Sequence, residues 1–193
     1  MTTTADRQLA VNRRRLLRVA AAAGLWLALT AHSPYRQWDV HRKTRLIVLV
    51  SRAEAPSVAL GSALAAVYAQ QLPESRATIA RARDTNDVVR LIATKQLDVA
   101  LLPERDAYAA AAGDAPYTDS GRPRLRALAV LGDYVFVCRD DLPVPSAYML
   151  TEALAERWRD IDPALVGAAA GPRPPATLAI PLHPGALEYY RDH

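Results

Sequence analysis

The chain has 193 residues, with 24 lysines and arginines against 20 aspartates and glutamates and a formal net charge of +4. This charge lies in the first 31 residues, which contain five arginines and one aspartate, so residues 32–193 are neutral. A neutral folded part argues against a nucleic-acid-binding protein, because such proteins use a basic surface to neutralise phosphates. The length allows one domain of ordinary size beyond those residues.

The first 31 residues have the pattern of an export signal. Arginines between Arg13 and Arg18 precede thirteen uncharged, mostly apolar residues that end at Ala31. This stretch is shorter than the ~20 residues that comfortably span a bilayer, and both a cleaved signal peptide and a retained signal anchor fit it. Both interpretations predict a periplasmic or otherwise extracytoplasmic protein, since the arginines stay inside. The alternative is an amphipathic surface helix of a cytoplasmic protein.

Residues 32–43 are polar and are interpreted as a linker, so the folded domain is predicted to span residues 44–193. Its first strand is the apolar run 46–50, which is typical of a strand buried on both faces of a parallel sheet. A helix is predicted from Ser57, as its N-cap, to Gln71.

The next segments continue this alternation of strands and helices. Strands are predicted at 77–81 and 97–102; one helix follows the candidate caps Asp84, Thr85 and Asn86, and another spans 104–112, where Gly113 ends it. The alternation indicates right-handed crossover connections. We therefore predict an α/β fold with a mainly parallel sheet flanked by helices.

The last third of the chain adds two strands, 125–131 and 134–138, separated by Gly132 and Asp133. A helix is predicted from Ser146 to Trp158, and a short final helix follows Pro184 and Gly185. These carboxyl-terminal helices are expected to pack back on the sheet. The single cysteine, Cys138, excludes an intramolecular disulfide. It is expected to pack as a small apolar residue, with a reactive thiol as the alternative.

Ligands of an open α/β sheet bind outside the carboxyl ends of its strands, where loops lead into helices. Three such places are visible here, at residues 51–57, 84–86 and 103–106. Free N–H groups at a helix start favour anions, so the first two are candidate carboxylate sites. The alternative is that these side chains only cap helices. The candidate ligand-binding residues are Ser51, Arg52, Ser57, Thr85, Asn86 and Glu104.

The sequence carries no strong catalytic pattern. It has no Gly-x-Ser-x-Gly elbow, no phosphate-binding glycine-rich loop and no dinucleotide fingerprint. His183 has no second metal ligand at a useful spacing, which favours a turn or packing role. The adjacent pair Asp140 and Asp141 is interpreted as a solvated turn rather than an acid–base couple. We therefore expect no enzyme activity, no cofactor and no metal.

The order of several motifs resembles that of the TAXI-type solute-binding proteins of TRAP transporters, in the periplasmic binding protein superfamily. The resemblance covers residues 45–191 and is most specific at the terminal segment Ile180-Pro-Leu-His-Pro-Gly-Ala-Leu-Glu-Tyr-Tyr-Arg191. The other similar segments are Ser57-Val-Ala-Leu-Gly-Ser-Ala-Leu64, Asp84 to Ala93, Leu97-Asp-Val-Ala-Leu-Leu102 and Leu125-Arg-Ala-Leu-Ala129.

The resemblance implies one lobe of a two-lobed receptor, because most of the second lobe is missing at about residues 139–141. The loop at residues 51–56 also lacks the glycine with which the family's loop approaches its ligand. Glu54 and Pro56 disfavour direct capture of a carboxylate there. Glu104 stands where the family has an uncharged polar residue.

Two functions follow from these observations as hypotheses. The first is an extracytoplasmic solute-binding protein that holds a small carboxylate, an amino acid or a dicarboxylate, for TRAP-type membrane transporter subunits. The alternative is a membrane-tethered accessory or interaction protein that keeps the scaffold without high-affinity ligand binding. A face exposed by the missing lobe would suit a protein partner, including a homodimer.

Overall fold

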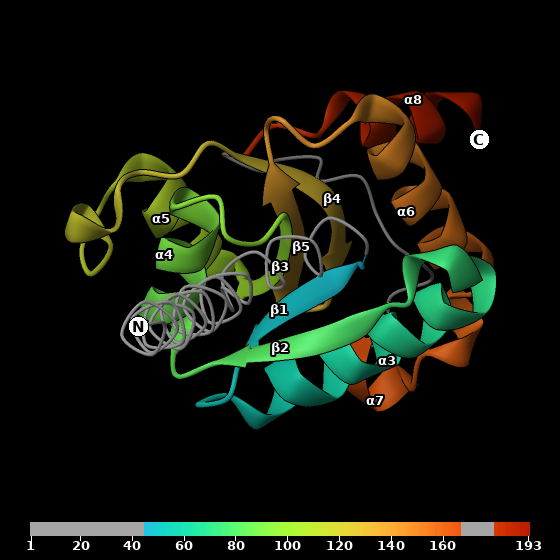
Figure 1. The fold of residues 1–193 in the computed structure, drawn as a ribbon, viewed down its shortest axis with the longest axis horizontal. Coiled ribbons are helices and arrows are strands. Elements are labelled where there is room, and N and C mark those ends of the chain that lie inside the picture. Colours follow the sequence, from blue (N-terminus) through green and yellow to red (C-terminus); the bar gives the residue numbers. More distant parts are fainter. Residues whose placement is uncertain (1–44, 167–179) are drawn as a thin grey trace, which may run out of the picture. The chain divides into compact units, whose positions relative to one another are not determined.

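The predicted alternation of strands and helices is present in a computed structural model, which describes residues 45–166 and 180–193 (Figure 1). These residues belong to one compact unit, Arg42–His193. The predicted export signal at 1–31 and the linker at 32–43 lie outside the described residues. Within the described part, no helix combines the length and apolarity needed to cross a membrane.

Five strands form one sheet in the order β2-β1-β3-β5-β4. Strand β1 pairs in parallel with β2 and β3, while β5 is antiparallel to both β3 and β4. Only β5 therefore runs against the others, and the predicted α/β fold with a mainly parallel sheet is confirmed. The strands are β1 (Ile47–Ser51), β2 (Thr78–Ala82), β3 (Val99–Pro103), β4 (Leu125–Leu131) and β5 (Tyr134–Arg139).

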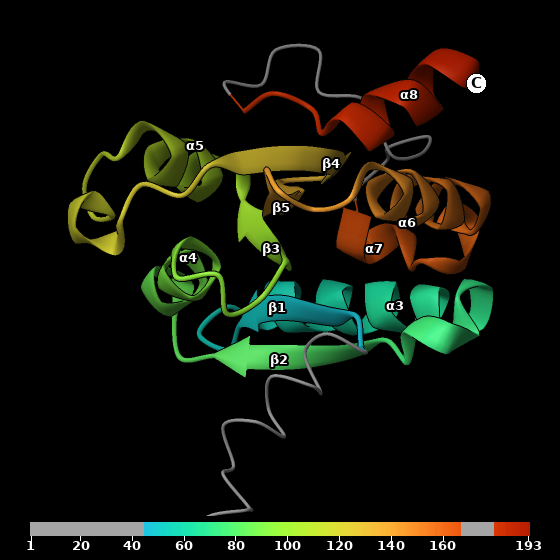
Figure 2. The same ribbon diagram turned by 45° about the horizontal axis from the view of Figure 1, so that its top comes forward.

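Helices cover both faces of this sheet (Figure 2). Alternate side chains of β1 divide between two cores: Val48 and Val50 pack toward α3 and α6, whereas Ile47 and Leu49 pack toward α4 and α5. Both faces of β1 are buried, as its continuous apolar sequence predicts. The helices are α3 (Ala55–Gln71), α4 (Thr85–Ala93), α5 (Glu104–Ala112), α6 (Val144–Glu156), α7 (Pro163–Val166) and α8 (Pro184–Asp192).

Two predicted N-caps are wrong by three residues, because Glu54 and Pro143, rather than Ser57 and Ser146, are the N-caps of α3 and α6. Helix α3 begins at Ala55 rather than at a Ser57 cap, and α6 begins at Val144 rather than at a Ser146 cap. In each helix a proline occupies the first turn, where the N–H that proline lacks has no helical partner to lose. Ser57 consequently lies inside α3, where it is fully buried. Helix α6 also ends earlier than predicted, at Glu156, and a short 3₁₀ turn over Trp158–Asp160 follows it.

The carboxyl-terminal helices pack back on the sheet, as predicted, and the segment before α8 also runs along the outer edge of β4. The Ala127 N–H donates to the Pro181 carbonyl, and the His183 N–H donates to the Ala127 carbonyl. The buried His183 ring lies 2.9 Å, at Nε2, from the Leu142 carbonyl, and its Nδ1 accepts from the Gly185 N–H at 3.2 Å. His183 therefore has the turn and packing role that the sequence favours.

Candidate functional site

The carboxyl ends of β1 and β3 and the turn between β4 and β5 border an open hollow of about 1100 Å³. This is the edge at which ligands of α/β sheets bind. Loops and helix starts supply its walls, since α3 and α5 begin directly beyond β1 and β3 (Figure 1). Its charged and aromatic lining consists of Glu54, Glu104, Arg105, Tyr108, Asp133 and Tyr134.

Glu54 is the residue that joins the elements around this hollow. Its carboxylate accepts a hydrogen bond from the Thr85 hydroxyl at 3.2 Å, through Oε1, and from the Tyr134 hydroxyl at 3.3 Å, through Oε2. Glu54 occupies the N-cap position of α3 in extended backbone but makes no side-chain cap. Its carboxylate is therefore available to connect the start of α4 with the start of β5.

Two tyrosines stay protonated in the hollow and act as donors. Burial, followed by the charge of Glu54, raises the pKa of Tyr134 to about 12. Burial is the larger cause and the hydrogen bond to Glu104 the smaller cause that together raise the pKa of Tyr108 to about 12. The Tyr108 hydroxyl lies 2.6 Å from Glu104 Oε1. Each phenol therefore donates to a carboxylate of the same chain at neutral pH.

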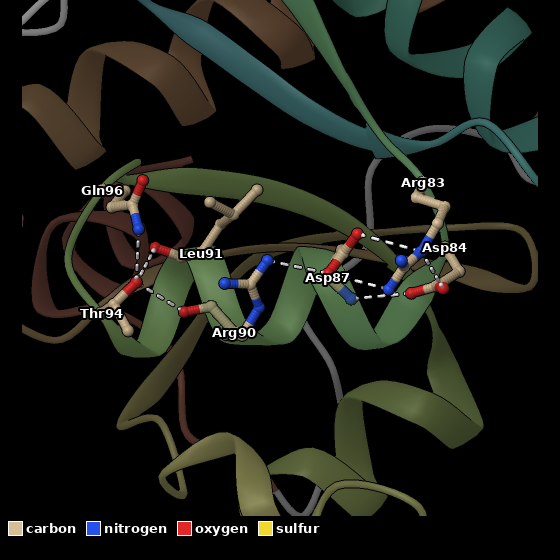
Figure 3. Close-up of polar contacts among 7 residues, drawn as sticks. All are labelled: Arg83, Asp84, Asp87, Arg90, Leu91, Thr94 and Gln96. Atoms are coloured by element: carbon tan, nitrogen blue, oxygen red, sulfur yellow. Dashed lines mark hydrogen bonds and ion pairs between the residues drawn. The ribbon is translucent and has the colours of Figure 1, made fainter.

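The start of α4 is capped by the chain itself (Figure 3). Asp84 Oδ1 accepts from the Asp87 N–H at 2.8 Å, and Arg83 lies 3.0 Å from Asp84 Oδ2. Both contacts lower the pKa of Asp84, and the hydrogen bond from the Asp87 N–H has the larger effect. Arg90 is paired with Asp87 on the next turn at 2.9 Å. Asp84 is thus the cap among the three candidates, and its carboxylate takes the place of an external anion.

The start of α5 differs, because its N-cap residue is Pro103 and no side chain caps it. The Glu104 N–H donates to the Asp133 carbonyl at 2.9 Å, which connects the helix to the turn between β4 and β5. The Glu104 side chain faces the hollow but is engaged by Tyr108. The Glu104 N–H at this helix start is therefore satisfied within the chain.

The structure separates the six predicted site residues. Glu104 lines the hollow and Thr85 reaches it through Glu54, whereas Arg52 and Asn86 are exposed to solvent away from its lining. Ser51 and Ser57 are buried beneath the loop, where the Ser51 N–H lies 3.4 Å from Ser57 Oγ. Only Thr85 and Glu104 therefore take part in the arrangement around the hollow.

The residues that sequence reasoning missed are Tyr134, Tyr108, Asp133 and the bridging role of Glu54. A charged residue in a strand-to-helix loop, Glu54, was a visible signal of the site, because it departs from the pattern of the family that the sequence resembles. The sequence held no such signal for Tyr134, since this residue reaches the edge only through the antiparallel pairing of β5 with β3.

The electrostatics of the hollow disfavour an anion. Glu54, Glu104 and Asp133 line it. Among the described lining residues Arg105 is the one cation, and it lies 3.4 Å from Asp106. Two like charges 4 Å apart repel by about 1 kcal/mol in water and about 4 kcal/mol near a protein surface. A free carboxylate in the hollow would therefore be repelled by the carboxylates of its lining.

The described residues do not form a metal centre. No group of three or more histidine, cysteine, aspartate or glutamate side chains among them is arranged to hold an ion. The Cys138 thiol is buried in β5, and burial raises its pKa. No protein-family model matches the chain, and no curated protein matches it significantly.

Proposed function

We propose that the chain is an extracytoplasmic accessory protein of a membrane transport system, built on one lobe of the TAXI-type solute-binding scaffold. It does not hold a free carboxylate at the ends of its strands. The series of TAXI-like motifs and the export-signal pattern support the scaffold and the location. The α/β sheet with helices on both faces is consistent with a single lobe.

One observation carries the choice between the two hypotheses: a carboxylate of the chain itself, that of Glu54, accepts the hydrogen bonds of Thr85 and Tyr134. Asp84 similarly satisfies the start of α4. An external carboxylate would have to displace Glu54 and lie among Glu104 and Asp133. A single lobe would also leave such a ligand partly in water, which weakens its polar contacts.

Titration of the full chain with glutamate, aspartate, succinate and 2-oxoglutarate tests this function by calorimetry. We expect no saturable heat at ligand concentrations up to several millimolar. A micromolar dissociation constant, lost in a variant that combines Thr85→Ala with Asn86→Ala, would overturn the proposal and favour the receptor hypothesis. An accessory role also predicts that the chain copurifies in detergent with the membrane subunits of a TRAP-type transporter.

The receptor hypothesis remains the second candidate because the strand ends do border a hollow, of about 1100 Å³. This volume is large enough for a small molecule and lies slightly above the typical range of about 300–1,000 Å³. A ligand there would contact Tyr108 and Tyr134 on the surface between the acidic groups. The same titration therefore decides between the two functions.

A further inference from the structure

The Glu54 carboxylate is held as a bound ligand would be held. Its two oxygens each accept from a different hydroxyl, and the donors lie 31 and 80 residues away along the chain. Thr85 opens α4 and Tyr134 opens β5, so the two donors are positioned by separate elements of the fold. The fold, and not the local loop, therefore builds the place that this carboxylate occupies.

Within the part of the chain that the structure describes, the Glu54 carboxylate has hydroxyl partners but no ion pair. Among residues 45–166 and 180–193, no lysine or arginine forms an ion pair with Glu54. The two hydroxyl contacts, 3.2 and 3.3 Å, are also longer than the 2.6 Å contact between Tyr108 and Glu104. Hydroxyl hydrogen bonds are typically about 2.7 Å long. The covalent tether thus keeps the carboxylate at its donors without the short contacts that an untethered anion can make.

We propose that the hydroxyls of Thr85 and Tyr134 form a latent subsite for a small monocarboxylate, and that Glu54 fills this subsite as a tethered occupant. Removing the Glu54 side chain opens the subsite to a free short-chain carboxylate. This inference rests on the proposed function, since it explains why the natural chain takes no external carboxylate. It makes Glu54 the residue that determines whether the site accepts an anion.

Acetate is the matched probe for this subsite. The Glu54→Ala variant lacks a CH₂–COO⁻ group, and acetate supplies a methyl group and a carboxylate of the same size. Acetamide has nearly the same shape without the charge, so it separates anion binding from simple filling of space. Sodium chloride at equal concentration accounts for ionic strength.

The experiment compares melting temperatures of the full chain in acetate, chloride and acetamide at neutral pH. For Glu54→Ala, we expect acetate at ten times its dissociation constant to raise Tm by about 3–6 °C relative to chloride. A dissociation constant of about 10 mM fits a site of two hydroxyl donors without a cation. Wild type and Glu54→Gln should respond equally to acetate and chloride, because a side chain of full length still fills the subsite.

The control for location adds Thr85→Val and Tyr134→Phe to Glu54→Ala, and this triple variant should lose the response. The proposal is overturned if Glu54→Ala responds no more than wild type, if acetamide acts as well as acetate, or if the triple variant still responds. Should Glu54→Ala be unfolded in chloride, its circular dichroism decides: recovery in acetate supports the subsite, and none refutes it. Failure of the proposed function would instead be seen as carboxylate binding by wild type.

Discussion

The contact between α8 and α6 depends on the absence of a side chain at Gly185, and Gly185→Ala tests it. A Cβ atom there would lie 2.8 Å from the Tyr148 nitrogen and closer still to the Val144 carbonyl oxygen, against ordinary contact at 3.4 Å or more. Both neighbours are backbone atoms of α6, which cannot rotate away. The two helices lie side by side in the natural chain (Figure 2), and in the variant they must move apart.

Overpacking of an interior typically costs about 1–3 kcal/mol, and the rigid backbone neighbours place Gly185→Ala near the upper end. The higher helix propensity of alanine offsets at most about 1 kcal/mol of this cost. We therefore expect a loss of about 2–3 kcal/mol in the free energy of unfolding, or about 5–10 °C in Tm for a domain of about 150 residues.

Urea and thermal unfolding of the full chain measure this loss. Glu188→Ala, at an exposed position of the same helix, is the matched control and should change stability by less than about 0.5 kcal/mol. If Gly185→Ala is as stable as its control, the close approach of α8 to α6 is refuted.

Two further predictions concern buried groups. Burial lowers the pKa of His183 below its ordinary 6.5, so the unfolded chain takes up this proton first as pH falls. The contribution of His183 to stability is complete above pH 6.5 and is lost as pH falls through the lowered pKa. Urea unfolding between pH 7.5 and 5 should show this loss as a falling free energy of unfolding. His183→Ala should reduce the slope of this free energy against pH, and an unchanged slope would contradict the assignment. The Cys138 thiol, buried with a raised pKa, should react with a thiol reagent at least about 100-fold more slowly in the native protein than in urea, and rapid native labelling would contradict its burial in β5.

The pattern of apolar residues, together with the glycines and prolines that end elements, predicted the strands and most helices. The apolar runs at 46–50 and 134–138 match β1 and β5 to within a residue, because a strand buried on both faces needs an unbroken apolar sequence. Gly113 ends α5 as predicted, in the left-handed conformation that glycine adopts at no steric cost. The starts of α3 and α6 were misplaced because Ser57 and Ser146 suggested caps, whereas prolines can begin a helix.

The candidate site was predictable only in its position. That loops 51–57, 84–86 and 103–106 meet at one edge follows from the alternation of strands and helices. The contact between Glu54 and Tyr134 spans 80 residues and depends on the direction of β5, which local sequence does not encode. Asp84 caps α4 through a local contact with the Asp87 N–H, whereas the bond from the Thr85 hydroxyl to Glu54 is a tertiary contact across 31 residues.

The Glu54 carboxylate is bound by separate elements of the fold at the ends of the strands. A double-mutant cycle of Glu54→Ala and Tyr134→Phe, followed by urea unfolding of the full chain in chloride, measures this interaction. A hydrogen bond to a charged group contributes about 1.5–3 kcal/mol. Because the contact is partly exposed and 3.3 Å long, we expect a coupling free energy of about 0.5–1 kcal/mol. A coupling indistinguishable from zero, with both single variants folded, would contradict the account.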